Sequence, residues 1–388
     1  MKRLDFVFFD AGGGHRSAAN ALKAIIEHQN RPWEVRLVDL KEILTSLDMI
    51  RKVTGISMEE VYNRLLKKGW TLGSGQLLTA MHIFIRAYHG GQVRLLKGFW
   101  QQSKPDLVVS LVPNFNRAFF QSLQESRPGT PMVTILTDLA DYPPNFWIEQ
   151  QMQYFICGTE KAAKQAYALG HPQDHVFRTS GMILRPSFYQ PISESREDGR
   201  RRLGLDPNLP TGLVLFGGEG SEWMIEITRT LSRAGLPLQL ILICGKNKIL
   251  QQRLEETKPG FPTVIEGFTN EVPYYMHLSD FFIGKPGPGS ISEAIAMKLP
   301  VVVERNAWTL PQERYNTDWI RENGLGVVLK SFRQIEAGLR ELLEPANLKR
   351  YRENAAAMNN RAVFEIPEIL AQLLDGKVQD RGSDNWRY

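Results

Sequence analysis

The stretch that decides the fold is Phe281-Phe282-Ile283-Gly284-Lys285-Pro286-Gly287-Pro288-Gly289-Ser290. Its first residues form an apolar run typical of a buried strand, and the glycines and prolines that follow predict a tight turn. A helix is predicted next, over residues 291–297. A strand that enters a helix through a glycine-rich turn is the repeating element of a parallel α/β sheet.

Similar elements are predicted on both sides of this stretch. Strands are expected at residues 4–10, 33–40, 106–112, 132–137, 154–157, 213–216, 238–243, 264–268 and 301–304. A helix is expected over 160–168. Residues 186–202, with prolines, serines and alternating charges, are expected to be a linker. The pattern predicts two doubly wound, Rossmann-like α/β domains that face each other across a cleft.

The expected domains are 1–185 and 186–365, and a chain of 388 residues is long enough for two such cores. Residues 366–388 would supply a last helix at 367–374 and a disordered tail from Gly376. The only two cysteines are Cys157 and Cys244, so no disulfide framework is expected and a reducing cytoplasm is indicated. No run of 18 apolar residues is present, so no membrane-spanning helix is predicted.

Glycine-rich or polar turns follow four predicted strands of the second domain. The residues singled out in these turns are Gly217, Gly218, Glu219, Phe268, Gly287, Gly289, Ser290, Gln312, Glu313 and Asn316. Backbone amides in glycine turns and at helix amino termini bind phosphates. Glu293, one turn further along the helix, could accept hydrogen bonds from both ribose hydroxyls. The four turns together predict a site for a nucleotide diphosphate-sugar.

Two plainer interpretations of these residues stay open. Ser290 and Glu293 fit a capping box, in which both side chains merely bind backbone amides at the helix start. The Gln312-Glu313 pair is also typical of a solvated helix face. The quoted stretch lacks the Gly-Lys-Ser/Thr ending of a P-loop, so ATP hydrolysis is not expected.

Four motifs together resemble those of the monogalactosyldiacylglycerol synthases. They are Gly12-Gly13-Gly14-His15, Gly217-Gly218-Glu219-Gly220, Lys285-Pro286-Gly287-Pro288-Gly289-Ser290-Ile291-Ser292-Glu293-Ala294, and Pro311-Gln312-Glu313 with Asn316. This family is related to the lipid-linked N-acetylglucosaminyl transferase of peptidoglycan synthesis and to the processive diacylglycerol glucosyltransferases. The resemblance spans about residues 4–374 and implies the two-lobed GT-B fold, a UDP-sugar donor and inversion at the anomeric carbon.

The resemblance also implies roles for single residues. Gly14 and the Gly217 turn would belong to the donor site, and the turn from Gly287 to Ser290 would hold the diphosphate. Glu293 would bind the ribose, and Phe268 would lie by the uracil. The sugar would contact Gln312, Glu313 and Asn316. The last helix would cross back onto the first domain.

His15 is the leading candidate for the catalytic base. It follows a strand and three glycines at a helix start, where the helix dipole would lower its pKa and keep the imidazole neutral. Asp138, at the end of another strand, could be the base or could orient His15. The alternatives are that His15 only bonds a neighbour and that Asp138 only caps a turn. No Asp-x-Asp motif occurs, so a metal-free site is expected.

The segment 51–104 predicts contact with a membrane. It holds nine basic residues and two acidic ones, a net charge of +7 in a chain whose net charge is +5. Its aromatic and basic residues, with an apolar run at 77–88, suit an anionic lipid surface. Those proposed to meet membrane or acceptor are Trp70, Phe84, Arg86 and Trp100. A core helix with a solvated basic flank stays an alternative, and no nucleic-acid partner is expected, because no nucleic-acid motif accompanies the charge.

The sequence therefore predicts an inverting, metal-independent transferase without a cofactor. It would move a hexose or N-acetylhexosamine from a UDP-sugar to a diacylglycerol-type lipid at the cytoplasmic face of the cell membrane. Pro143 stands where the resembling family has a histidine, which leaves the sugar and the lipid open. The alternatives are a UDP-sugar 2-epimerase, a UDP-sugar sensor, and a polyprenyl-linked or lipid A-type acceptor.

Overall fold

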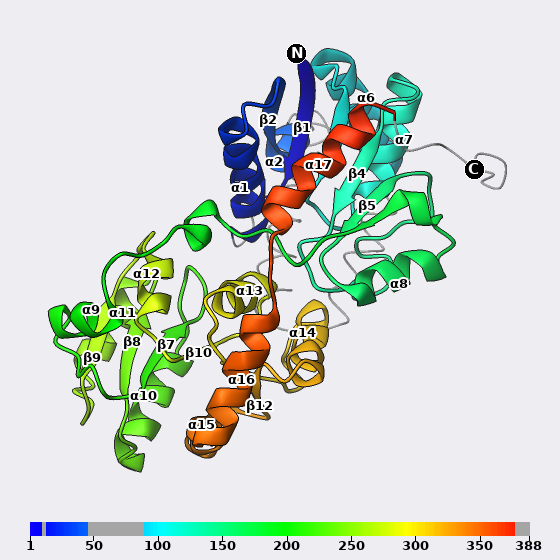
Figure 1. Ribbon diagram of the computed structural model, residues 1–388. Helices are drawn as coiled ribbons and strands as arrows, with labels where there is room; N and C mark the ends of the chain where they lie inside the picture. The colour runs from blue at the N-terminus through cyan, green and yellow to red at the C-terminus, as the bar shows by residue number, and fades with distance from the viewer. Residues whose placement is uncertain (10–12, 46–88, 377–388) are drawn as a thin grey trace. The chain divides into compact units, whose positions relative to one another are not determined.

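The computed structural model describes residues 1–9, 13–45 and 89–376, and the chain divides into two compact units (Figure 1). The first unit comprises Met1–Pro186, Leu310–Gln312 and Arg361–Tyr388, and the second comprises Ser187–Thr309 and Glu313–Asn360. The tail beyond residue 376, which was expected to be disordered, lies outside the described residues. Each unit contains one parallel sheet with helices, which confirms the predicted α/β class.

The first unit is built on a six-stranded parallel sheet with the strand order β2-β1-β3-β4-β5-β6. The strands are β1 (Lys2–Phe8), β2 (Trp33–Asp39), β3 (Leu107–Ser110), β4 (Met132–Ile135), β5 (Tyr154–Cys157) and β6 (Val176–Arg178). The order reverses between β1 and β3. In an open parallel sheet, such a reversal leaves a crevice at the carboxyl ends of the two strands, where ligands bind.

Six α-helices of the first unit are described. They are α1 (Gly14–His28), α2 (Leu40–Thr45), α6 (His89–Ser103), α7 (Asn116–Ser126), α8 (Glu160–Ala168) and α17 (Ala362–Leu374). A short 3-10 turn, Gln173–His175, also belongs to the first unit, and a second one, Pro186–Tyr189, spans the boundary to the second unit.

Helix α17 lies against α1, so the end of the chain returns to the first unit (Figure 1). Arg31 pairs with Glu368, and the Glu365 carboxylate accepts a 2.8 Å hydrogen bond from the backbone of Ser180. The helix was expected only over 367–374 and begins five residues earlier, at Ala362. Pro367 does not interrupt it, because the apolar face that includes Val363 and Leu370 is buried along its whole length.

The second sheet also has six parallel strands, in the order β12-β11-β10-β7-β8-β9. The strands are β7 (Thr211–Leu215), β8 (Gln239–Ile243), β9 (Thr263–Glu266), β10 (Phe281–Gly284), β11 (Val301–Glu304) and β12 (Gly326–Leu329). Here the order reverses between β7 and β10. The turns after these two strands are the glycine-rich turns singled out from the sequence, so they lie at the expected ligand position.

Among the described residues, eight α-helices accompany this sheet, and the first two residues of one of them, Pro311 and Gln312, are grouped with the first unit. The eight helices are α9 (Arg196–Arg202), α10 (Trp223–Ala234), α11 (Lys248–Glu255), α12 (Val272–His277), α13 (Pro288–Ala296), α14 (Pro311–Glu322), α15 (Ile335–Leu343) and α16 (Pro345–Ala357). A 3-10 turn, Phe332–Gln334, precedes α15.

The expected linker at 186–202 is wrong for residues 196–202, which form helix α9. Two of its charged side chains are packed against the rest of the unit. Arg196 and Arg200 each donate to the Asp280 carboxylate at 2.7 Å, and the side chain of Arg200 is only 7% exposed. Ser195 caps the helix by accepting a hydrogen bond from the Asp198 backbone. The segment is therefore a packed part of the second unit.

Both cysteines are free and buried, one in each unit. Burial raises the pKa of the Cys157 thiol to about 12 and that of the Cys244 thiol to about 11. Cys157 ends β5 and Cys244 directly follows β8, and both strands are almost entirely buried, as is usual for parallel sheets covered by helices. None of the helices in the described ranges combines the length and the apolar character that crossing a bilayer requires.

Candidate functional site

The turns after β7 and β10 meet at the reversal of the second sheet. Gly217 and Gly220 have φ angles of 75° and 63°, which a side chain would strain, so the turn needs glycine at both positions. A Cβ atom placed on Gly217 would lie 3.7 Å from Cε of Lys285, in the turn after β10. The two glycine turns thus form one wall, with a lysine side chain between them.

The turn after β8 is hydrogen-bonded to the turn after β7 and holds it in place. The backbone amide of Lys246 donates to the carbonyl oxygen of Gly218 at 2.8 Å. Asn247 Nδ2 donates to the carbonyl oxygen of Glu219 at 3.2 Å. A Cβ atom on Gly245 would lie 2.1 Å from the Gly218 oxygen, so only glycine allows this approach. Gly218 and Glu219 are exposed on a turn that is held in one position.

Helix α13 begins earlier than the sequence suggested. Its N-cap is Gly287 and its first residue is Pro288, whereas we expected the helix from residue 291. Ser290 is therefore the third helical residue and cannot be an N-cap, so the capping-box interpretation of Ser290 and Glu293 is wrong. A Cβ atom on Gly289 would meet nothing within 4 Å, so the first turn presents its amides on an open side. Glu293 is half-buried in the second turn.

Helix α14 turns three polar side chains inward. Gln312, Glu313 and Asn316 are 7%, 8% and 0% exposed, so the solvated-face interpretation is wrong. Oε1 of Glu313 lies 3.5 Å from Nζ of Lys285, and Nδ2 of Asn316 donates to the Pro286 carbonyl at 2.8 Å. These contacts tie α14 to the turn after β10.

In two of these side chains the amide oxygen accepts no hydrogen bond from the described residues. Among the described residues, Oε1 of Gln312 and Oδ1 of Asn316 are buried and have no hydrogen-bond partner. An unsatisfied buried polar group costs about 1–3 kcal/mol, and an amide oxygen can be satisfied by a hydroxyl group. The arrangement is therefore suited to a ligand rich in hydroxyls.

Phe268 lies beyond β9 and is 61% exposed, an unusual position for a phenylalanine. The Lys246 ammonium is 5.6 Å from the centre of its ring. Because Lys246 also bonds Gly218, Phe268 is linked to the glycine wall through one residue. The exposed face of an aromatic side chain beside a glycine turn can stack on the planar ring of a ligand.

His15 is the centre of a second group, in the first unit. It is the second residue of α1, after Gly14, and is half-buried. Its Nδ1 is 2.9 Å from Oγ1 of Thr137, and its ring centre is 5.8 Å from that of Trp147. Burial lowers the pKa of His15 to about 4, so the imidazole is neutral at cellular pH. We expected the lowering from the helix dipole, but its cause is burial.

Asp138 belongs to the same group through Trp147. It is 9% exposed, and its Oδ2 accepts a 2.8 Å hydrogen bond from Nε1 of Trp147. Asp141 holds the following segment by accepting hydrogen bonds from the backbone amides of Asn145 at 3.0 Å and Trp147 at 2.6 Å. Burial raises the pKa of Asp141 to about 6. The indole that touches His15 is thus fixed from both its ring and its backbone.

Two family models match separate halves of the chain. Residues 15–182 match the monogalactosyldiacylglycerol (MGDG) synthase family, and residues 213–373 match the glycosyltransferase family 28 C-terminal domain. The chain is a glycosyltransferase whose first half is similar to the MGDG synthases. The sequence is 28% identical to monogalactosyldiacylglycerol synthase 1, chloroplastic, of Arabidopsis thaliana over 97% of this chain and 72% of that protein.

Solved structures show the fold of this glycosyltransferase. MurG of Acinetobacter baumannii matches with a TM-score of 0.61 at 14% identity, over 96% of this chain and all of that one. UDP-GlcNAc 2-epimerase from Neisseria meningitidis, bound to UDP-GlcNAc, matches with a TM-score of 0.58 at 14% identity, over 97% of this chain and all of that one. The expected GT-B fold and the resemblance to the MGDG synthases are confirmed.

Of the four residues expected to contact membrane or acceptor, the structure describes one. Trp70, Phe84 and Arg86 lie outside the described residues. Trp100 is described, and the expectation for it is wrong, because its side chain is 0% exposed in the core of the first unit. Its Nε1 donates to Oγ of Ser122 at 2.9 Å. A buried tryptophan on an amphipathic helix looks the same in sequence as one facing lipid.

Three site residues escaped the sequence reasoning. Thr137 directly precedes Asp138 at a strand end, so its position was a usable signal. Lys285 lies inside the stretch that decides the fold, but only the contact with Glu313 shows that it belongs to the site. Trp147 gave no signal, because its contact with His15 joins segments 132 residues apart in the chain.

Proposed function

We propose that this glycosyltransferase transfers a hexose or N-acetylhexosamine from a UDP-sugar to a diacylglycerol-type membrane lipid, with inversion and without a metal ion. The observation that carries the proposal is the wall formed by the β7 and β10 turns, with Lys285 between them and α14 beside them. It combines open amides, a cation and unused hydroxyl acceptors, which are the groups that a diphosphate-sugar requires.

In this proposal each part of the donor meets one part of the wall. The diphosphate lies against the Gly217 turn and the first turn of α13, where amides and the Lys285 ammonium offset its charge. The ribose binds Glu293 and the uracil stacks on Phe268. The sugar hydroxyls donate to the free oxygens of Gln312 and Asn316, while Glu313 keeps Lys285 in place.

The chemical step follows from the protonation state of His15. The lipid hydroxyl attacks the anomeric carbon on the face opposite the diphosphate, and Nε2 of His15 takes the hydroxyl proton. The bond between that carbon and the diphosphate oxygen breaks, and UDP leaves with the electron pair. In the tautomer that carries its proton on Nδ1, His15 donates a hydrogen bond to Oγ1 of Thr137, and the Nε2 lone pair is free for this role. Lys285 and the α13 amides stabilise the departing charge, which is the work a metal ion would otherwise do. Asp138 holds Trp147 against the imidazole.

The lipid acceptor rests on the family and on charge. The first half of the chain matches a family described by the synthesis of monogalactosyldiacylglycerol. The segment 51–104 carries a net charge of +7, and each basic residue near an anionic surface contributes about 1 kcal/mol. We propose that the chain binds peripherally to the cytoplasmic face of the cell membrane through this segment.

Incubation with candidate donors and acceptors tests the proposal. UDP-glucose, UDP-galactose and UDP-N-acetylglucosamine are each mixed with vesicles that contain diacylglycerol, a polyprenyl phosphate or lipid A, and the lipids are analysed by mass spectrometry. We expect a hexosylated diacylglycerol, lost in His15→Gln and kept in His28→Gln, an exposed histidine on the same helix. Conversion of the nucleotide-sugar without any glycosylated lipid would show an epimerase and overturn the proposal. Binding of UDP-sugar with no product would show a sensor.

A further inference from the structure

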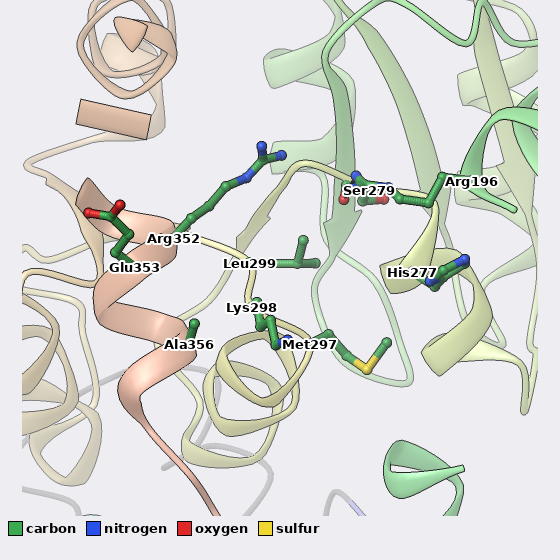
Figure 2. Close-up of a pocket in the computed structure, with 9 residues that line it drawn as sticks. All are labelled: Arg196, His277, Ser279, Met297, Lys298, Leu299, Arg352, Glu353 and Ala356. Carbon is green, nitrogen blue, oxygen red and sulfur yellow. Dashed lines mark hydrogen bonds between the residues drawn. The ribbon is translucent and has the colours of Figure 1, made fainter. Parts of the chain in front are cut away.

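A cavity lies in the second unit, at the amino ends of the strands, whereas the glycine wall lies at their carboxyl ends. Its volume is about 450 Å³. Ser279 and Leu299, which line it, precede the amino ends of β10 and β11, whereas the glycine wall follows the carboxyl ends. The cavity, whose lining residues are shown in Figure 2, is therefore separate from the proposed donor site.

The wall of this cavity is predominantly basic. Arg196, Lys298 and Arg352 line it together with His277, and Glu353 is the one carboxylate among the described lining residues. Glu353 is itself paired with Lys349, at 3.9 Å. The basic side chains labelled in Figure 2 come from three separate segments, with Arg196 in α9, Lys298 in the turn after α13 and Arg352 in α16.

The carboxylate behind the wall does not neutralise these charges. Asp280 binds Arg196 at 2.7 Å, Arg200 at 2.7 Å and Arg352 at 2.5 Å, so one negative charge is shared by three guanidinium groups. Like charges held this close in a partly buried site repel each other, and an added anion would relieve the repulsion. The wall thus has an excess of positive charge that the fold leaves unmatched.

Arg196 also has a hydrogen-bond donor that the described residues leave unused. Its terminal nitrogen bonds Asp280 and the Ser279 carbonyl, but its Nε is buried and has no acceptor among the described residues. A buried N–H of a charged group without an acceptor is costly, and a phosphate oxygen is a strong acceptor for guanidinium. Lys298 is exposed and adds a mobile ammonium at the rim.

The rest of the lining is apolar. Met297, Leu299 and Ala356 line the cavity, and Figure 2 shows Leu299 between Arg352 and Arg196. A ligand that fits both parts carries a compact anionic group and a small apolar portion. We propose that this cavity binds a phosphate monoester, with the phosphate at Arg196, Lys298 and Arg352 and the organic part on Met297 and Leu299.

Calorimetric titration of the full chain tests this second site. Inorganic phosphate and glycerol 3-phosphate are the soluble probes, at constant ionic strength, and vesicles with and without a phosphomonoester lipid test a membrane source of the same group. We expect saturable binding of a soluble probe, of the lipid, or of both. Binding of neither would overturn the proposal.

Variants then locate the binding. Lys298→Glu should weaken it about tenfold or more, because it reverses a charge at the rim. Ala356→Phe, on an exposed helix position, should block the cavity sterically without changing charge. Lys258→Glu is the matched control, because Lys258 is also exposed with a left-handed φ, 44° against 61° for Lys298.

The variant Lys285→Gln distinguishes binding at the donor site from binding in this cavity, because it changes only the glycine wall. Phosphate binding that survives Lys298→Glu and Ala356→Phe but is lost in Lys285→Gln would place the anion at the donor site and refute the second site. The opposite pattern would support it, whatever the outcome for sugar transfer.

Discussion

Lowering the pH from about 7.5 to about 5.5 should leave sugar transfer almost unchanged, because His15 stays neutral. An ordinary imidazole with a pKa near 6.5 is only about 10% neutral at pH 5.5. His15, whose pKa burial lowers to about 4, is about 97% neutral there. The expected loss in kcat/KM is thus a few per cent, against about tenfold for an unperturbed base. The acid limb should appear only near pH 4.

The assay is the pH profile of kcat/KM for transfer from the active UDP-sugar to lipid vesicles. Asp141, whose pKa burial raises to about 6, titrates in the same range and holds the Trp147 segment. Asp141→Asn is therefore measured alongside, so that any limb near pH 6 from this carboxyl is recognised. Imidazole NMR of the wild type and of His15→Gln assigns the His15 signal and gives its pKa directly.

Two results would refute this reasoning. One is an acid limb near pH 6.5 that persists in Asp141→Asn, and the other is a His15 signal that titrates between pH 6 and 7. Either would mean that water reaches the imidazole in the working enzyme, so that burial does not keep it neutral. His28→Gln serves as the control for loss of a histidine from the same helix.

Three further predictions concern the donor wall and stability. Lys285→Gln should weaken UDP binding roughly tenfold in calorimetry, because a charge-assisted contact is lost, while Lys258→Gln should not; equal affinities would remove Lys285 from the site. Asp280→Asn should lower the free energy of unfolding, measured in urea, by about 3–5 kcal/mol, because three arginines lose their counter-charge. The exposed Asp198→Asn should cost less than about 1 kcal/mol. Similar losses in the two variants would contradict this prediction. His171 is 4% exposed, and burial lowers its pKa to about 4, so the unfolded chain takes up its proton first and stability falls by about 3 kcal/mol as pH drops from 6.5 to 4. His171→Gln should flatten that part of the pH dependence of urea unfolding, and an unchanged slope would refute it.

Local patterns predicted the elements that are regular over several residues. Strand β5 and helix α8 have the bounds expected from the sequence, because their apolar and helical patterns are uninterrupted. Strands β6 and β12 are not among the predicted strands, because β6 has only three residues and β12 begins at Gly326, a residue type typical of turns. The sequence predicts too late a start for α13 because Pro288 and Gly289 are typical of turns, although proline also suits the first position of a helix.

The candidate site was predictable as a set of turns but not as a set of contacts. Residues at the ends of parallel strands could be named because all such ends share one edge of a sheet. The contacts of His15 with Thr137 and of Lys285 with Glu313 join positions far apart in the chain, and only packing decides them. Burial was also out of reach, as Trp100 shows, because the same amphipathic pattern serves a core and a lipid surface.

The two buried thiols make this chain convenient for spectroscopy. The thiolate is the form that reacts with maleimides and iodoacetamides, and with pKa values of about 11 and 12 roughly one thiol in ten thousand or fewer is ionised at neutral pH. The native protein therefore behaves toward these reagents as if it had no cysteine. A pair of new surface cysteines, one in each unit, can carry fluorescent dyes without removing Cys157 or Cys244. The distance between the dyes would then report how the two units move when donor and lipid bind.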